Sequence, residues 1–229
     1  MTDFAPIAVP TPNDVPEAFG FVACEGGVCA AEGVSAAGLH AGFRRDPNRR
    51  DMALIVADET CVAAGTFTTN RFCAAPVIVS REHVADGHAR AVILNSGNAN
   101  AATGEPGLRN AYKTADMVAA ILDCPAEQVL VASTGIIGQH LNMDTMQAGL
   151  PQVTAVLGRD LEINDYACAR AIMTTDTKPK RCAVAWRDES GAVYHLGGMC
   201  KGSGMISPNM ATMICMLTTD APVAPAVLD

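Results

Sequence analysis

The feature that most constrains the fold is a change in the spacing of apolar residues along the chain. Short apolar or alternating runs, separated by turn-forming residues, come first, at residues 52–57, 61–68, 76–80 and 89–95. Runs of this length and pattern are typical of β-strands in a covered sheet. Their close succession predicts a meander of strands.

From Pro106 the apolar residues recur at every third or fourth position, which is the period of a helix with one buried face. The members of this apolar stripe are Leu108, Ala111, Tyr112, Ala115, Val118, Ala119 and Leu122. We expect the helix to end before Pro125, and we predict further helices at 144–157 and 165–173. Pro151 is expected to break the first of these two, because proline removes a backbone donor and clashes with the preceding turn.

Other segments again have the pattern of strands. A buried strand is predicted at 129–133 and a last strand at 213–218. Residues 181–187 and 192–198 are predicted to pair as a hairpin, because Gly191 between them can adopt a positive φ.

The composition defines the core and excludes several functions. With 229 residues, 49% of them hydrophobic, the chain can bury a sizeable core. Only 4% of the residues are aromatic, so the core must consist of Ala, Val, Ile, Leu and Met, which favours a layered α/β or α+β protein. The net charge of −8 argues against nucleic acid as a partner. The one basic run, residues 44–50, is interrupted by Asp, Pro and Asn, and we interpret it as a solvated loop without a role.

The cysteines and the N-terminal segment indicate a compartment. The nine cysteines form no paired CxxC units, so no metal site is expected. Residues 1–20 hold four prolines and no basic-then-apolar leader, which predicts a loose or surface-bound arm and a cytoplasmic protein with reduced thiols. Cys24 and Cys29 would bridge only in an oxidising compartment. No apolar stretch approaches the length of about 18 residues that a membrane span needs.

The segment that carries chemical information is 201–212, KGSGMISPNMAT, which is followed by the apolar run MICMLTTDA. Its glycines and the pair Pro208-Asn209 predict a tight loop that brings Thr212 to the start of a strand. Threonine also favours strands for purely structural reasons, because it is β-branched. The residues of the segment alone therefore leave a structural and a functional interpretation open.

This segment closely resembles the cleavage-site signature of the glutamate N-acetyltransferase/ornithine acetyltransferase family, enzymes of the acetylated arginine pathway. In that family the bond before the threonine breaks autocatalytically, which gives an α chain and a β chain whose first residue is the nucleophile. The resemblance places the cut between Ala211 and Thr212. Further blocks resemble the family in the same order, at residues 65–77, 95–104, 133–138, 171–177 and 197–201. The resemblance thus extends over roughly residues 20–221.

The resemblance implies catalytic roles that agree with the chemistry of the residues. Cleavage would give Thr212 a free α-amine, and an adjacent amine is a base that can activate a threonine hydroxyl. The ordinary pKa of such an amine is about 7.7–8.0, so part of it is unprotonated near neutral pH. Thr134 and Gly135 would stabilise the oxyanion of the tetrahedral intermediate. From spacing alone, an ordinary strand-to-turn Thr-Gly is the alternative interpretation.

The resemblance also implies substrate-binding residues. Lys201 would bind the α-carboxylate of an acetylated amino acid, although by itself it could be a surface charge. Thr174 or Thr175 would contact substrate, and the sequence does not distinguish between them. The Asn- and Gly-rich block 95–104 is expected to lie beside the site without a catalytic step of its own.

By resemblance, the fold should be an α/β (α+β) sandwich of two packed β-sheets covered by helices, as in ornithine acetyltransferase and DmpA-like proteins. Residues 21–211 would form the α-chain acyltransferase domain and 212–229 the start of the β chain. Family members continue far past the nucleophile, so we expect most of the β chain to be missing and the chain by itself to be poorly active.

The implied reaction moves acetyl from N-acetylornithine to Thr212, and from Thr212 to glutamate. It needs no metal or bound cofactor, but some family members also take acetyl from acetyl-CoA, and that donor stays open. An α2β2 assembly of chains from one precursor is expected. Two rivals also stay open: a self-processing threonine aminopeptidase or amidohydrolase, in which water removes the acyl group, and an inactive assembly module.

Overall fold

Two four-stranded sheets form the framework of the computed structural model, which describes residues 20–202 and 213–228. The strands are β1 (Val22–Cys24), β2 (Val34–Leu39), β3 (Met52–Val62), β4 (His88–Asn98), β5 (Val129–Ile136), β6 (Lys180–Arg187), β7 (Val193–Lys201) and β8 (Ile214–Thr219). The helices are α1 (Ala75–His83), α2 (Gly104–Leu122), α3 (Met143–Ala155), α4 (Tyr166–Ala171) and α5 (Pro225–Leu228). Short helical turns are η3 (Val28–Ala30), η4 (Val84–Asp86), η5 (Ala126–Gln128) and the π-helical turn η6 (Leu161–Asp165).

The first sheet has the order β2-β3-β4-β5 and is covered on both faces. Strands β2, β3 and β4 are antiparallel, whereas β5 runs parallel to β4 after the crossover helix α2. On β3, Met52 and Leu54 face the cluster formed with α1, α2 and α3, and Ala53 and Ile55 face the second sheet. Because neither face of residues 52–56 meets water, this half of β3 reads as a continuous apolar run instead of an alternating one, whereas residues 58–61 are exposed.

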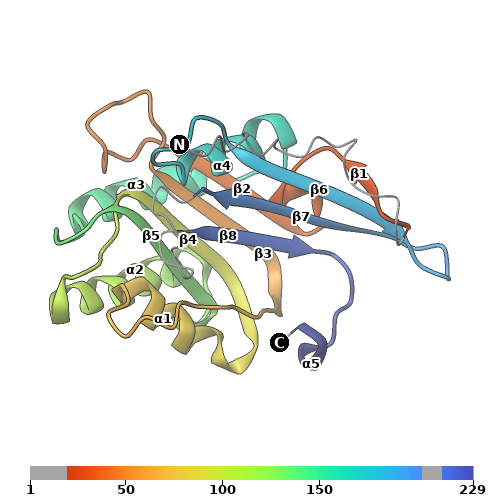
Figure 1. Ribbon diagram of the computed structural model, residues 1–229, viewed down its shortest axis with the longest axis horizontal. Helices are drawn as coiled ribbons and strands as arrows, with labels where there is room; N and C mark the ends of the chain where they lie inside the picture. Colours follow the sequence, from red (N-terminus) through yellow and green to blue (C-terminus); the bar gives the residue numbers. More distant parts are fainter. Residues whose placement is uncertain (1–19, 203–212, 229) are drawn as a thin grey trace, which may run out of the picture.

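The second sheet has the order β1-β6-β7-β8 and is antiparallel throughout. Its inner face contributes Met199, Ile214 and Met216 to a core shared with Ile55 and Leu94 of the first sheet, and α4 belongs to the same cluster. Figure 1 shows β7 and β8 crossing over β3 and β4, with α1 and α2 near β5. The predicted sandwich of two packed sheets with helices is therefore confirmed.

The opposite side of the second sheet, which we call the outer face, carries apolar and thiol side chains in contact with solvent. Strand register places Cys182, Cys200, Cys215 and Leu217 on this face. Leu217 is 68% exposed, and Met213, just before β8, is 41% exposed. The outer face is therefore far more exposed to solvent than either face of the first sheet, whose apolar side chains belong to the two buried clusters.

Most of the predicted elements are confirmed, namely the strands at 52–57, 89–95, 129–133 and 213–218, the hairpin around Gly191, and the helices. The strand predicted at 76–80 is wrong, because this segment lies in helix α1. Pro76 stands in the first turn of α1, where its missing N–H costs nothing, and Val79 is fully buried against the first sheet. Only the first two residues of the strand predicted at 61–68 belong to β3.

The break predicted at Pro151 is also wrong, since α3 continues through this residue. Leu150 and Val153 on the same helix are buried in the core, and this packing offsets the roughly 3 kcal/mol that an interior proline costs. Among the helices of the described residues, none is long and apolar enough to cross a membrane.

Candidate active site

Ala211 and Thr212 lie outside the described residues, but the strands on either side of them are described. Lys201 is the last residue of β7 and Ile214 the first of β8, and the two face each other across the antiparallel pair. The segment that contains Thr212 therefore leaves and re-enters the second sheet at the same end of the β7–β8 pair.

Thr134 and Gly135 lie near the end of β5, against β4. Gly135 has φ +138°, and a Cβ at this position would lie 2.4 Å from the carbonyl carbon of Gly97. Both the backbone angle and this close approach require glycine. Thr134 is buried and pairs with Ser96 of β4, whereas the neighbouring Ile136 is 55% exposed. A ligand can thus reach the backbone just after Thr134.

The Asn- and Gly-rich block after β4 builds the turn beside Thr134. Ser133 Oγ donates to Asn95 Oδ1 at 2.6 Å, and Asn95 Nδ2 donates to the Asn98 carbonyl at 2.9 Å. Asn100 has φ +45°, and its Nδ2 donates to the Gly107 carbonyl in the first turn of α2. These amide side chains satisfy buried backbone groups, which explains the density of Asn in the block.

Asp176 connects the two described segments that carry predicted substrate-binding residues, and it also binds Lys180 at the start of β6. Its Oδ2 accepts from the Thr174 backbone N at 3.1 Å, and its Oδ1 accepts from the Gly202 backbone N at 2.7 Å and from Lys180 Nζ at 2.5 Å. The Asp176 side chain is only 2% exposed. Burial alone would raise the pKa of this carboxyl, but the hydrogen bonds from Lys180, Thr174 and Gly202 outweigh burial and hold its pKa below the ordinary value.

Lys201 is buried next to this group. It is 2% exposed, and its Nζ donates to the Gly202 carbonyl at 2.7 Å. Burial lowers the pKa of Lys201, and the positive charges of Lys180 and Arg44 lower it further, although Asp176 acts in the opposite direction. The side chains near Lys201 thus include more cations than anions, an environment that favours binding of an anion.

The basic run at 44–50 also reaches this site, which corrects its interpretation as a solvated loop without a role. Arg44 Nε donates to Ser96 Oγ at 3.2 Å and Arg44 Nη2 to the Met173 carbonyl at 2.8 Å. Arg49 Nη2 donates to the Thr174 carbonyl at 2.6 Å. The charged heads of these arginines therefore hold the segment after α4, while residues 45–48 are exposed as expected.

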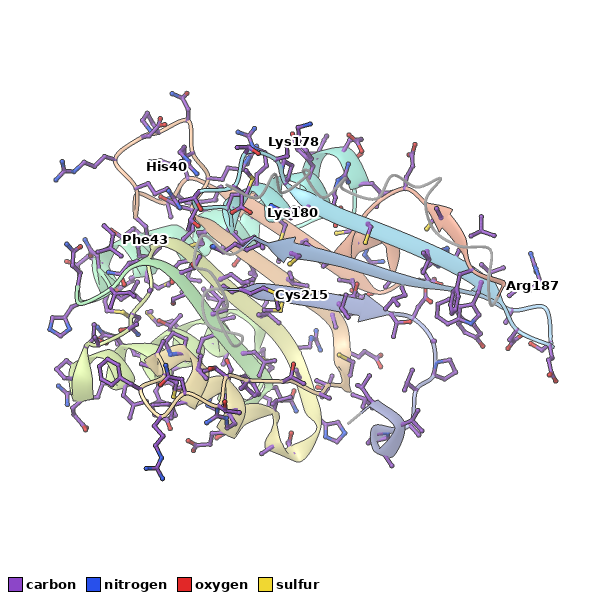
Figure 2. The ribbon with its side chains drawn as sticks, viewed as in Figure 1. His40, Phe43, Lys178, Lys180, Arg187 and Cys215 are labelled. Atoms are coloured by element: carbon purple, nitrogen blue, oxygen red, sulfur yellow. The ribbon has the colours of Figure 1, made fainter. Side chains whose placement is uncertain are left out.

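Buried Asp51 fixes the conformation of the loop that carries Arg44. The side chain of Asp51 is fully buried and accepts from the backbone N–H groups of Ala41, Gly42 and Arg44. In Figure 2, Phe43 of this loop lies on the left, Lys180 at the start of β6 lies near the middle, and Arg187 marks the other end of β6 on the right.

Of the predicted site residues, Thr174 and Lys201 are brought together through Asp176. Thr134 joins the same region through Ser96, which faces it on β4 and whose Oγ donates to the Ala171 carbonyl at 2.6 Å. Thr175 is exposed on the same loop. Sequence reasoning missed Asp176 as a connecting residue, although it completes the motif Thr174-Thr175-Asp176.

The described residues also form a cavity with a different lining, and they offer no metal site. A cavity of about 830 Å³ is bounded by residues 63–73, by the end of α1 with η4, and by α5. Within 20–202 and 213–228, the histidine, cysteine and acidic side chains form no group of three or more that could hold a metal ion.

The chain is similar to a known protein family and to several of its members. The model of the ArgJ family matches residues 35–229. The arginine biosynthesis bifunctional protein ArgJ of Thermosynechococcus vestitus is 50% identical over 201 residues, which is 87% of this chain and 47% of that protein. The protein of the same name from Bifidobacterium longum is 48% identical over 86% of this chain and 49% of its own length. The chain thus spans about half the length of the curated relatives it matches.

Two solved structures share the fold. The arginine biosynthesis bifunctional protein ArgJ of Bacillus halodurans superimposes with a TM-score of 0.77 and 37% identity, over 83% of this chain and 99% of that one. An ornithine acetyltransferase from Mycobacterium tuberculosis, crystallised in complex with ornithine, gives a TM-score of 0.75 and 38% identity, over 86% of this chain and 100% of that one.

Proposed function

The chain belongs to the ArgJ family, and from that premise we propose that it carries an acetyltransferase site of arginine biosynthesis. The site moves acetyl from N-acetylornithine to glutamate through an acetyl-Thr212 intermediate, after cleavage of the Ala211–Thr212 bond. The observation that carries this proposal is the set of contacts made by Asp176, which joins Thr174 to the end of β7 next to Lys201, where the chain enters the segment with Thr212.

Substrate binding uses the positive charge of this region. Both N-acetylornithine and glutamate carry an α-carboxylate, and a buried ammonium is a compact partner for it. Lys201 supplies that ammonium, and Thr174 or Thr175 contacts the rest of the amino acid. The solved relative that was crystallised with ornithine supports this class of ligand.

Self-cleavage creates the catalytic base. The Thr212 hydroxyl attacks the Ala211 carbonyl, and the acyl group moves from the Thr212 nitrogen to its oxygen, which frees the α-amine. Water then hydrolyses the ester, which releases the Ala211 carboxylate and the Thr212 hydroxyl. Before cleavage the nitrogen of Thr212 belongs to the peptide bond with Ala211 and cannot accept a proton, so cleavage is an irreversible activation. The freed amine then takes the hydroxyl proton while Thr212 attacks the acetyl carbonyl of N-acetylornithine.

The oxyanion formed in that attack needs hydrogen-bond donors placed before the reaction. We assign this role to Thr134 and Gly135. Two observations support this assignment. The backbone that follows the buried Thr134 is exposed, and Gly135 packs closely against the backbone of Gly97. Ornithine leaves, glutamate takes the acetyl group from Thr212, and no metal or bound cofactor takes part. Acetyl-CoA is a second acetyl donor to be tested in the same assay.

The two products of cleavage would stay together. Strands β7 and β8 pair from Leu196 opposite Thr219 to Lys201 opposite Ile214, so each product would contribute strands to one sheet. We propose an α2β2 assembly of such products. We also propose that the protein acts in the cytoplasm, because all nine of its cysteines are free thiols, as suits a reducing compartment.

The experiment compares the chain with its Thr212→Ala and Thr212→Ser variants, each alone and coexpressed with the C-terminal half of a relative. Intact-mass measurement should show cleavage at Ala211–Thr212, none for Thr212→Ala, and partial cleavage for Thr212→Ser, which keeps the hydroxyl. The samples are then incubated with N-acetylornithine, with and without glutamate. Formation of N-acetylglutamate supports the transferase, whereas acetate released at the same rate without glutamate would identify a hydrolase. Cleavage of Thr212→Ala would refute the assignment of the nucleophile.

A further inference from the structure

Three cysteines lie close together on the outer face of the second sheet, on the neighbouring strands β6, β7 and β8. Cys200 on β7 is directly opposite Cys215 on β8. Cys182 on β6 faces Gly198, so it lies diagonally across from Cys200. Cys182 and Cys215 are exposed and Cys200 is half-buried, and all three are free thiols. Figure 2 shows Cys215 on β8, in the strand that follows the Thr212 segment.

The position of Cys200 and Cys215 meets the requirements of a disulfide. Residues directly opposite in an antiparallel pair have Cα atoms about 4.5–5.5 Å apart. Disulfides need Cα distances of about 4.4–6.8 Å, so the strands need not move to form one. The neighbouring Cys200 contributes to the raised pKa of the Cys215 thiol, which agrees with the closeness that the strand register gives. Cys182 is a poorer partner for Cys200, because diagonal neighbours are about 7–8 Å apart.

We propose that Cys200 and Cys215 form a redox-active pair, which a low-molecular-weight disulfide such as oxidised glutathione converts into a cross-strand disulfide. One cysteine thiolate attacks the glutathione disulfide and releases one glutathione thiolate. The second cysteine thiolate then attacks the mixed disulfide, forms the Cys200–Cys215 bond and releases the second glutathione. The two cysteines lose two electrons and two protons, and one oxidised glutathione becomes two reduced ones.

The bridge would join the two strands that flank residues 202–213. Cys200 immediately precedes Lys201, and Cys215 immediately follows Ile214. Lys201 and Ile214 are themselves partners across the two strands. If the bond between Ala211 and Thr212 is cut, a consequence that rests on the proposed function, the bridge becomes a covalent link between the two products. Formation of the bridge itself does not depend on that cut.

The experiment uses the whole chain, reduced and then incubated with oxidised glutathione at mildly alkaline pH. Burial raises the pKa of the Cys215 thiol, and the neighbouring Cys200 and Cys182 raise it further, so alkaline buffer supplies more thiolate. Free thiols are then blocked and the protein is digested with trypsin without reduction. Trypsin cuts after Arg187 and Lys201, so the two cysteines separate unless they are bridged.

The expected result is a dominant cross-linked species that joins peptide 188–201 to the peptide that contains Cys215, and that disappears on reduction. That second peptide begins at Gly202 in uncut chain and at Thr212 in chain cut at Ala211–Thr212. The Cys182→Ser variant is the matched control and should keep the bridge, whereas Cys200→Ser and Cys215→Ser should each abolish it. A dominant link from Cys182, or thiols at 200 and 215 that stay free while others oxidise, would overturn the proposal. Electrophoresis gives a separate readout of cleavage, because cleaved protein separates into two pieces only after reduction if the bridge is present. Absence of cleavage would count against Thr212 as the nucleophile. The peptide map reports the bridge in either case.

Discussion

Replacing Asp176 by asparagine tests whether this one carboxylate organises the site. Asparagine has the same shape but only one acceptor oxygen. If that oxygen takes the place of Oδ1, it still accepts from Lys180 and from the Gly202 N–H, but the amide NH₂ then faces the Thr174 N–H, donor against donor. The opposite orientation loses two bonds, so the first is preferred.

The magnitude follows from these contacts. Leaving one backbone N–H without an acceptor in a buried position costs about 1–3 kcal/mol. The two bonds that remain lose their charge, and charge-assisted bonds are roughly twice as strong as neutral ones. Lys180 is partly exposed, so water compensates part of that loss. We expect Asp176→Asn to lower the free energy of unfolding by about 2–4 kcal/mol near neutral pH.

The loss should depend on pH. The pKa of Asp176 is lower in the folded protein than in the unfolded chain, so the unfolded chain binds more protons as the pH falls through the carboxylate range. The contribution of Asp176 is therefore complete above its unfolded pKa and is lost as the pH falls through its folded pKa. Asparagine does not titrate, so the difference between the two proteins should shrink on acidification.

The assay is urea unfolding followed by circular dichroism, from about pH 7 down to about pH 3, the range over which a carboxyl titrates. Asp46→Asn is the control, because Asp46 lies in an exposed turn and accepts from the Asn48 N–H. Its effect should stay within about 0.5 kcal/mol. If Asp176→Asn behaves like Asp46→Asn, or if its deficit is constant with pH, the connecting role of Asp176 is wrong.

Two further predictions concern the end of β5. Thr134→Ala should lower kcat by about 10²–10³ in acetyl transfer, because an oxyanion donor acts on the transition state. A rise in KM with unchanged kcat, measured in steady-state kinetics, would instead assign Thr134 to ground-state binding. Gly135→Ala should destabilise the protein severely, since its Cβ would overlap Gly97, whereas Gly138→Ala, which has positive φ but open space, should cost only about 1–3 kcal/mol of backbone strain. Equal melting temperatures for the two alanine variants would show that the contact with Gly97 does not require glycine at position 135.

The sequence was most informative where hydrophobic period alone decides the structure. The stripe of α2 and the run of β3 predicted their elements because burial on one face or on both faces follows directly from spacing. Helix α1 was mistaken for a strand because its Val and Ile favour strands locally, and the packing of Val79 against the first sheet reversed that preference.

The candidate site was predicted only as far as motifs extend. The family resemblance pointed to Thr134, Lys201 and the Thr174-Thr175 pair, and two of these regions meet through Asp176. The contribution of Arg44 could not be predicted from spacing, because the carbonyl it binds is 129 residues away in sequence. A charge run has the same local pattern whether it meets solvent or carbonyl groups of a distant loop.

The order in which the two sheets become complete has a consequence for biosynthesis. All strands of the first sheet lie between Val34 and Ile136, but β1 pairs with β6, and the second sheet is complete only at Thr219. At about 5–20 residues per second, a ribosome needs about 4–17 s to make residues 137–219. During that interval the face of the first sheet that carries Ile55 and Leu94 has no partner sheet. A nascent chain of this protein therefore exposes an apolar sheet face, and is prone to aggregate, until the strands of the second sheet have been made.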